Sequence, residues 1–489
     1  MTDHHPLSRE PSPETVSSVR LLADQALSRA AGAPLLPGNN IRLLKDAAEN
    51  YPAWLDAIRG ATRTIHFEIY IIHEDDIGHR FADALITKQQ EGVQVRLLYD
   101  WMGALGKTSR RFWRPLREAG IEVRCFNPPR LSSPLSWLSR DHRKMLAVDG
   151  RVGFVTGLCI GQMWVGDPAR GIEPWRDTGV EVQGPAVAAI EQAFAQIWAT
   201  TGPPLPKTEI ARREDLSPAG TIGLRVIASE PSEAELYRLD TLIAAVARRS
   251  LWLTDAYFVG TTTYVRALIA AARDGIDVRL LVPGSSDIAL VRAISRAGYR
   301  SLLEGGVRVF EWKGPMMHAK TAVADGQWAR VGSTNLNPAS WIGNWELDVA
   351  VEDEGFARQM EAMFLEDLQH ATEIVLSARR KVRPTTAVFT QPAAHFRRGR
   401  GSTNRAVAGA LRIGNAVSAA ITNRRVLGPA EATVLSSGGL LLFILAVVAV
   451  LWPRVIAIPL AILSGWVGIA LLSRAYNLRF SKKKRQSRR

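Results

Sequence analysis

One short motif occurs twice in this chain, and its repetition limits the possible folds more than any other feature. Residues 142–149 read HRKMLAVD and residues 318–325 read HAKTAVAD, so His, Lys and Asp recur at matched positions. Side chains alternate along an extended chain, which places the His and Lys of each copy on the same face of a strand. Two imidazoles and two ammonium groups suit attack on a phosphodiester by histidine, with the lysines holding the phosphate charge.

Each motif also predicts a β-hairpin. The apolar residues between Lys and Asp indicate a buried strand, and the Asp-Gly pair that follows indicates a tight turn. In the second copy the returning strand would carry Ser333 and Asn335 back toward His318 and Lys320. Hydroxyl and amide groups there could hydrogen-bond phosphate oxygens.

The repeat extends beyond the two motifs. Residues 91–98 (EGVQVRLL) parallel residues 274–281 (DGIDVRLL), and an apolar strand with a tyrosine, Tyr70 or Tyr257, precedes each. Strands that alternate with helices predict an α/β fold, a sheet flanked by helices. Neither half carries two His-Lys pairs. We therefore expect two halves, related by a pseudo-twofold axis, that face each other and share one active site.

The pattern H-x-K-x4-D-x6-G-S-x-N resembles the signature of the phospholipase D superfamily. The second copy matches it throughout, whereas the first has Thr156, Gly157 and Cys159 where Gly, Gly or Ser, and Asn are usual. The resemblance covers roughly residues 38–375. Several segments are similar to bacterial cardiolipin synthases, namely residues 126–144, 175–178, 184–187 and 256–259.

This resemblance implies a phosphatidyltransferase that needs no cofactor and no metal. In cardiolipin synthases one phosphatidylglycerol gives its phosphatidyl group to the enzyme, and a second lipid, usually phosphatidylglycerol, takes it while glycerol leaves. One histidine attacks phosphorus to form a phosphohistidine, and the other acts as acid and base. The family pattern favours His142 as the nucleophile and His318 as the acid and base.

The resemblance also implies a site built from both halves. Asp177 and Glu346 are expected to orient the histidine of the opposite half. The motif residues Asp149 and Asp325 belong to the catalytic signature, although their turn chemistry predicts that they fix the hairpins rather than touch substrate. The expected catalytic residues are His142, Lys144, Asp149, His318, Lys320 and Asp325, and the expected substrate-binding residues are Gly157, Ser333 and Asn335.

The C-terminal part of the chain differs sharply in charge from the rest. From Ile374 to the end there are 20 Lys or Arg and a single acid, Glu431, so this part has a net charge of +19. Since the whole chain has a net charge of +14, the residues before Ile374 carry −5. Residues 434–452 and 455–472 carry no charge and approach the ~20 residues that a membrane-spanning helix needs. The alternative is one buried helical hairpin or a re-entrant loop. Basic residues on both outer flanks favour cytoplasmic ends.

We expect the following organisation of the chain. Residues 1–18 are polar, so no secretory signal peptide is expected, and residues 21–31 indicate a helix. The expected segments are 1–37, a polar extension with a helix; 38–205, the first half; 206–220, a linker; 221–375, the second half; 376–432, a basic segment that lies on the membrane or is disordered; 433–473, two transmembrane helices; and 474–489, a basic tail.

These features predict a multi-pass protein of the bacterial inner membrane with its catalytic body in the cytoplasm. The expected partners are anionic phospholipids, phosphatidylglycerol and cardiolipin, and the membrane itself, with no nucleic acid. Two cysteines in dissimilar settings suit a reducing compartment. Two other functions stay open. One is a phospholipase D or transphosphatidylase that uses water or another alcohol, and the other is a membrane-tethered nucleic-acid phosphodiesterase or binding protein.

Overall fold

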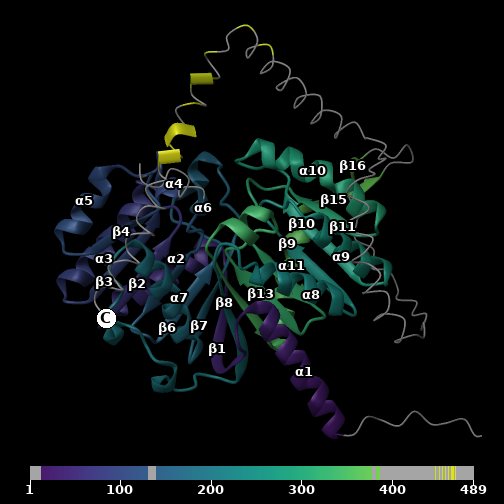
Figure 1. Cartoon of the computed structure of the whole chain (residues 1–489), viewed down its shortest axis with the longest axis horizontal. Helices are drawn as coiled ribbons and strands as arrows, with labels where there is room; N and C mark the ends of the chain where they lie inside the picture. Colours follow the sequence, from purple (N-terminus) through teal and green to yellow (C-terminus); the bar gives the residue numbers. More distant parts are fainter. Residues whose placement is uncertain are drawn as a thin grey trace, which may run out of the picture.

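The computed structural model describes residues 13–129, 139–376 and 382–385, together with scattered positions between 447 and 469. In these residues the strands form one continuous sheet with helices on both faces (Figure 1). The strand order is β16-β15-β11-β10-β9-β12-β13-β14-β8-β1-β7-β6-β5-β2-β3-β4. The predicted α/β class is confirmed.

The sheet consists of two similar halves. The first contains β1 (Leu36–Lys45), β2 (Thr64–Ile69), β3 (Gln94–Asp100), β4 (Glu122–Phe126), β5 (Met145–Val148), β6 (Val152–Thr156) and β7 (Thr178–Gln183). The second contains β8 (Ile222–Ser229), β9 (Ser250–Thr254), β10 (Asp277–Pro283), β11 (Arg308–Trp312), β12 (Thr321–Ala324), β13 (Trp328–Gly332) and β14 (Glu346–Glu352), followed by β15 (Ala371–Leu376) and β16 (Val382–Thr385). Outward from the antiparallel contact of β1 with β8, the two orders correspond strand by strand. The expected pair of halves is therefore confirmed.

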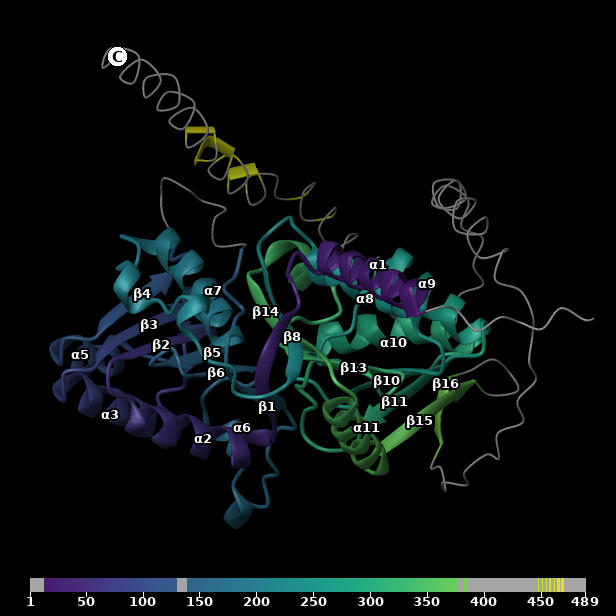
Figure 2. The same ribbon diagram turned by 90° about the horizontal axis from the view of Figure 1, so that it is seen from below.

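Helices cover both faces of each half, and the arrangement is inverted between the halves (Figure 2). In the first half α2 (Asp46–Gly60), α3 (Asp76–Gln90) and α5 (Arg110–Glu118) lie on one face and α7 (Ala186–Thr201) on the other. In the second half α8 (Glu235–Val246), α9 (Thr262–Arg273) and α10 (Ala289–Glu304) take one face and α11 (Glu354–Gln369) the other. Short helices α4 (Trp101–Ala104) and α6 (Gln162–Val165), and a π-helical turn over Ala339–Gly343, follow strand ends.

Buried aromatic and aliphatic side chains fill the space between helices and sheet. In the first half Trp54 from α2 packs edge-on against Phe67 of β2 and Phe81 of α3, with ring centroids 6.4 and 6.1 Å apart. Edge-to-face contacts of this kind add to the free energy gained by burying apolar area. The sheet is thereby a rigid base for the loops at its edges.

Both motif hairpins form as predicted. β5 pairs with β6 and β12 pairs with β13, in antiparallel register. At each tip an Asp-Gly pair occupies the left-handed region, with φ of 56° and 67° at Asp149 and Gly150 and of 56° and 63° at Asp325 and Gly326. Two successive positive φ values are what a two-residue type I′ turn requires, and glycine meets this requirement without strain.

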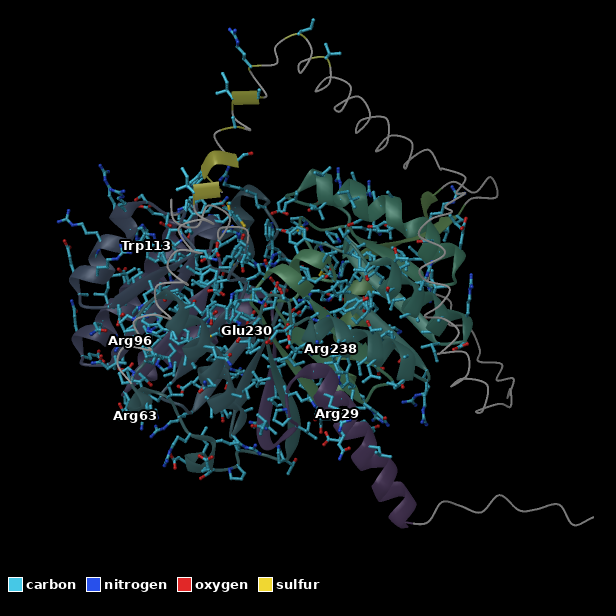
Figure 3. The ribbon with its side chains drawn as sticks, viewed as in Figure 1. Arg29, Arg63, Arg96, Trp113, Glu230 and Arg238 are labelled. Atoms are coloured by element: carbon cyan, nitrogen blue, oxygen red, sulfur yellow. The ribbon has the colours of Figure 1, made fainter. Side chains whose placement is uncertain are left out.

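The segments before and between the halves pack in ways that the sequence did not indicate. The N-terminal helix α1 (Pro13–Ala31) packs against α8 of the second half, and Asp24 forms an ion pair with Arg225 of β8. The connection at 206–220 lies on the first half, where Arg96, labelled in Figure 3, contacts Glu209 at 2.8 Å.

Among the residues that the structure describes, no helix is both long and apolar enough to cross a membrane. The two expected spans, residues 434–452 and 455–472, lie outside the described residues except at isolated positions. Of the expected basic segment 376–432, only Leu376 and β16 (Val382–Thr385) are described, as strands of the sheet, and the tail 474–489 lies outside the described residues. The transmembrane hairpin therefore stays a prediction.

Candidate active site

The two histidines lie at the same edge of the sheet. β5 runs antiparallel to β2 and β6, with Met145 opposite Glu68 and Val155, so the start of β5 lies beside the ends of those strands. β12 has the same relation to β9 and β13. His142 and His318 precede β5 and β12, and the sheet therefore delivers both imidazoles to one edge.

Short crossing contacts bring the halves together at this edge. The backbone N–H of His142 donates to Trp345 O at 2.9 Å, and that of His318 donates to Arg176 O at 2.7 Å. Each histidine is thus held against the opposite half at the residue just before Glu346 or Asp177. The motifs of the two halves face each other rather than form separate sites.

Each imidazole contacts a carboxylate of the opposite half. His142 Nδ1 lies 2.9 Å from Glu346 Oε2, and His318 Nδ1 lies 2.7 Å from Asp177 Oδ2. Both carboxylates are completely buried. A proton shared between Nδ1 and the carboxylate fixes the ring tautomer and leaves Nε2 to act on substrate. The structure thus places residues 177 and 346 beside the histidines of the opposite half, and their expected role in orienting those histidines stays a prediction.

Different residues hold the two orienting carboxylates. Ser333 Oγ donates to Glu346 Oε2 at 2.6 Å, whereas Trp164 Nε1 donates to Asp177 Oδ2 at 3.2 Å. At Gly157, the counterpart of Ser333, a Cβ would lie 2.3 Å from Asp177 Oδ1, so only glycine fits. The first motif has Gly where the second has Ser, and the indole of Trp164 supplies the hydrogen bond to the acid that the serine hydroxyl supplies in the second half. In this structure Ser333 and Gly157 contact the acids, and their expected role in phosphate binding stays a prediction.

The two lysines are buried beside the histidines. Lys144 Nζ donates to His142 O, and Lys320 Nζ donates to His318 O and lies 2.8 Å from His318 Nδ1 and 3.1 Å from Nε2. Buried ammonium groups in this position can hold the charge of a phosphate's non-bridging oxygens. Lysine cations from both halves therefore converge on one site.

The positions of Asn335 and its counterpart Cys159 complete the site. Both side chains are buried, and Asn335 Oδ1 has no hydrogen-bond partner among the described residues. Burial raises the pKa of the Cys159 thiol, and the charges of Lys144 and Lys320 act against that rise. Cys159 therefore lies close to both lysines as a neutral thiol, and the Asn335 amide is available to a ligand.

Asp149 and Asp325 are not brought to the histidines, which corrects their inclusion among the catalytic residues. Each lies past the far end of a four-residue strand, roughly 13 Å along the chain from its start. Asp149 accepts hydrogen bonds from the backbone of Thr62, Arg63 and Thr64. Asp325 accepts from the corresponding residues 248–250. Both aspartates tie the hairpin tip to the neighbouring strand, as their turn chemistry predicts.

Burial and neighbouring charges set the protonation of the site. The pKa of His142 and that of His318 are lowered to about 4, chiefly by burial; at His318 the charge of Lys320 adds to the lowering and Asp177 opposes it. Burial raises the pKa of Asp177 and Glu346, but the facing histidine and lysine more than offset this, and both pKa values fall below the ordinary range. Without substrate the site therefore holds two neutral imidazoles and two ionised acids. An arriving phosphate anion favours protonation of one imidazole.

Lys320 should determine the alkaline limit of activity. Burial lowers its pKa to about 8, so its positive charge is present below that pH and is lost as the pH rises through it. We expect turnover to fall above about pH 8. Lys320→Arg, which stays charged, should move this limb to higher pH, and Lys320→Met should be inactive throughout. An unchanged alkaline limb in the arginine variant would assign the titration to another group.

Several further residues of the site were missed by sequence reasoning. Arg143 Nε donates to Glu346 O at 3.1 Å, and Arg176 Nη1 donates to Asp177 O, so a buried guanidinium fixes the main chain of each orienting acid. Tyr70 packs against His142 with ring centroids 4.9 Å apart. Similar contacts with His318 come from Trp164, Trp175 and Tyr257. Only the recurrence of a tyrosine in each half signalled any of these contacts.

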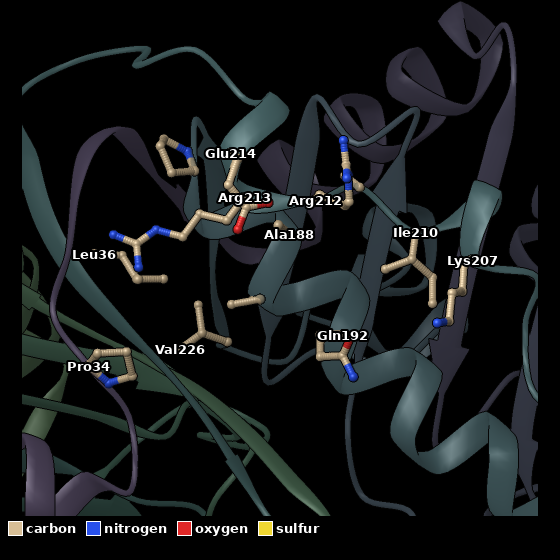
Figure 4. Close-up of a pocket in the computed structure, with 13 residues that line it drawn as sticks. Pro34, Leu36, Ala188, Gln192, Lys207, Ile210, Arg212, Arg213, Glu214 and Val226 are labelled. Atoms are coloured by element: carbon tan, nitrogen blue, oxygen red, sulfur yellow. The ribbon is translucent and has the colours of Figure 1, made fainter.

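A cavity of about 620 Å³ lies elsewhere, between α7, β1, β8 and the connection between the halves (Figure 4). It is lined by apolar side chains such as Leu36 and Val226 and by charged ones such as Arg213. Its lining residue Ala211 also lies over the hairpin tip at Gly150, the end opposite the histidines. This cavity is therefore separate from the active site.

Two facing His-Lys hairpins, with each imidazole held by an acid of the other half, define a phospholipase D-like protein. Within that class, the chain belongs to the cardiolipin synthase family. The family model described as "Cardiolipin synthase, PLD-like domain" matches residues 54–198 and 242–368.

Individual proteins agree with this assignment. The chain is 35% identical over 356 residues to a cardiolipin synthase of Alkalihalophilus pseudofirmus, covering 70% of this chain and 69% of that protein. It is 32% identical over 369 residues to cardiolipin synthase A of Pseudomonas fluorescens, covering 73% of this chain and 74% of that one. The fold also resembles a solved phosphatidylserine synthase of Haemophilus influenzae, with a TM-score of 0.58 and 15% identity over 71% of this chain and 91% of that chain.

Proposed function

We propose that this protein makes cardiolipin by transferring a phosphatidyl group from phosphatidylglycerol to a second phospholipid, phosphatidylglycerol in the simplest case. The observation that carries the proposal is the pair of imidazoles, one from each half, each with Nδ1 on a buried carboxylate of the other half. The relatedness to cardiolipin synthases supports this choice of substrate.

In the first step Nε2 of one histidine attacks the phosphorus of phosphatidylglycerol. A P–N bond forms and the P–O bond to the terminal glycerol breaks, while the second histidine, protonated once the phosphate has bound, gives its proton to the leaving oxygen. Lys144 and Lys320 hold the non-bridging oxygens as charge develops on them. Free glycerol is the first product.

In the second step the acceptor lipid's hydroxyl gives its proton to the neutral second histidine and attacks phosphorus. A P–O bond forms, the P–N bond breaks, and cardiolipin leaves with the first histidine restored. The family resemblance favours His142 as the nucleophile and His318 as the acid and base. The pKa of both is lowered to about 4, so their resting charge does not distinguish the roles.

Lipid mass spectrometry tests this function. The purified full chain, reconstituted with phosphatidylglycerol as the sole phospholipid, should release one glycerol for each cardiolipin formed. A His318→Ala protein prepared in parallel is the background control. Phosphatidic acid as the main product would instead make the protein a phospholipase D, and phosphatidyl esters of an added alcohol would make it a transphosphatidylase of broader choice.

Since the lysines take the part that metal ions play in other phosphoryl-transfer sites, turnover should survive removal of divalent ions. We expect activity in excess EDTA to stay within about twofold of the untreated protein, because Lys144 and Lys320 supply positive charge from the chain itself. The measurement is cardiolipin formation before and after dialysis against EDTA. A loss that one particular divalent ion restores would contradict a metal-free site.

We also propose that residues 434–452 and 455–472 form a transmembrane hairpin with the catalytic body and both termini in the cytoplasm. The support is the length of the two uncharged runs and the basic residues on both outer flanks. A cysteine introduced at Pro453 should react with a membrane-impermeant reagent added to intact spheroplasts. Cysteines at Thr2 and Ser487 should react only after lysis, and the reverse pattern would invert the proposed topology.

A further inference from the structure

Apolar side chains are exposed on the loops around the active site. These loops leave the sheet where β3, β6, β10 and β13 end, which is the edge that carries both histidines. Figure 1 shows α4, α6 and α10, which follow three of these strands, along one edge of the molecule. The exposed side chains, here named the apolar collar, are Leu105 (55% exposed), Val165 (38%), Ile172 (45%), Ile288 (45%), Leu290 (68%) and Ile342 (53%).

The collar is built twice, once by each half. Leu105 lies five residues beyond the end of β3, and Ile288 lies five residues beyond the end of β10. Val165 and Ile342 lie nine and ten residues beyond the ends of β6 and β13. Because β3 corresponds to β10 and β6 to β13 under the pseudo-twofold, the members of each pair lie on opposite sides of the histidines. An exposed apolar residue at four corresponding loop positions indicates a surface rather than isolated side chains.

The same loops carry charged residues of both signs, so charge favours neither a cationic nor an anionic partner. Lys107 and Arg170 are exposed there, but so are Glu173 and Asp287. Contact through the collar therefore depends on burial of apolar area, with the mixed charges left at the polar boundary.

The place of the collar around the site limits what can cover it. The side chains of His142 and His318 are only 11% and 8% exposed, so a protein seated over all four loops would close the remaining access. A bilayer in the same place is itself the source of substrate, because each lipid substrate carries two acyl chains that are insoluble in water. The occupant that is compatible with turnover is a lipid surface.

We propose that the apolar collar inserts into the bilayer interface and seats the active site directly on the lipid surface. This inference rests on the proposed lipid substrates and adds the surface through which they enter. Apolar side chains on loops of both halves would enter the boundary between headgroups and acyl chains, as interfacial segments do. Donor and acceptor lipids then reach the histidines without leaving the membrane.

Charged substitutions in the collar should lower the turnover of lipid in a bilayer but not the turnover of dissolved lipid. The test protein is the full chain carrying Leu105→Glu, Ile288→Glu and Ile342→Glu. Its turnover of phosphatidylglycerol in vesicles should fall by about tenfold or more, since three carboxylates oppose insertion. Its turnover of short-chain phosphatidylglycerol dissolved as monomers should stay within about twofold of wild type, because none of the three residues contacts the catalytic groups.

The matched control is Val246→Glu. Val246 is 53% exposed, like Ile342, but it ends α8 at the opposite edge of the sheet. Its turnover should be unchanged on both forms of lipid. An equal loss on vesicles and monomers in the collar variant, or a loss of the same size in the control, would overturn the proposal.

A second readout is independent of activity. A fluorophore attached through Ile342→Cys should be quenched by lipids that carry a nitroxide on the acyl chain, and one attached through Val246→Cys should not. Equal quenching at both positions, or quenching at neither, excludes insertion of the collar even if the enzyme is active. If the fluorophore at 342 is quenched but the protein turns over neither form of lipid, insertion of the collar would be supported and the proposed function would be wrong. A wild-type dimer that the three glutamates dissociate would assign the collar to self-association instead.

Discussion

Replacement of either His142 or His318 by alanine should abolish turnover almost completely. We expect a loss on the order of 10⁴-fold or more in each single variant, because the nucleophile and the acid act in the same displacement. The double variant should be little worse than either single one, since groups that act as a unit are not additive. The measurement is cardiolipin formed per mole of protein from phosphatidylglycerol vesicles.

His79→Ala is a suitable control, because His79 is an exposed side chain on α3 that packs against Phe112. It should retain near wild-type turnover. If His142→Ala or His318→Ala kept a substantial fraction of the activity, the halves would contain separate sites. A double variant that lost the product of the two single effects would contradict action of the two histidines as a unit.

The orienting acids should show the next largest effect. Asp177→Asn and Glu346→Gln remove the negative charge that holds Nδ1 of the opposite histidine but keep the shape of the side chain. We expect kcat to fall about 100-fold in each variant with little change in KM, because an outer partner that sets the tautomer and direction of an active group is typically worth 10–100-fold. The measurement is a full kinetic curve on vesicles of constant composition.

These variants also test the crossing between halves. Asp177→Asn should add almost nothing to the loss in His318→Ala, because the carboxylate acts through that imidazole. Glu354→Gln is the control, since Glu354 is an exposed acid that pairs with Arg358 on α11. A large rise in KM with kcat intact would mean that the acids bind substrate instead of orienting histidine.

The features that could be predicted from sequence are those carried by local chemistry and by the repeat. Asp-Gly after a buried strand specifies a tight turn, so the hairpins at 149–150 and 325–326 were accessible. Each half carries only one His-Lys pair, and the sequence therefore predicted two halves that face each other and share one site. The resemblance to a known family supplied the expectation that Asp177 and Glu346 cross between the halves.

The features that escaped prediction depend on contacts between distant segments. Trp164 donates a hydrogen bond to Asp177, whereas in the second half the hydroxyl of Ser333 donates to Glu346. The glycine at 157 indicates only that there is no room for a side chain at that position. The chain gives no local sign that Arg143 reaches the carbonyl of Glu346. Asp149 and Asp325 share the motif with the histidines but lie at the far end of the strand, because four extended residues separate them from the site.

The most direct test of a single shared site is the stoichiometry and position of the covalent intermediate. Protein mixed with phosphatidylglycerol and denatured at alkaline pH, where phosphohistidine survives, can be digested and mapped by mass spectrometry. A shared site predicts at most one phosphatidyl group per chain, always on the same histidine, His142 or His318, and none when that histidine is alanine. Phosphatidyl groups on both histidines in comparable amounts, or more than one per chain, would contradict it.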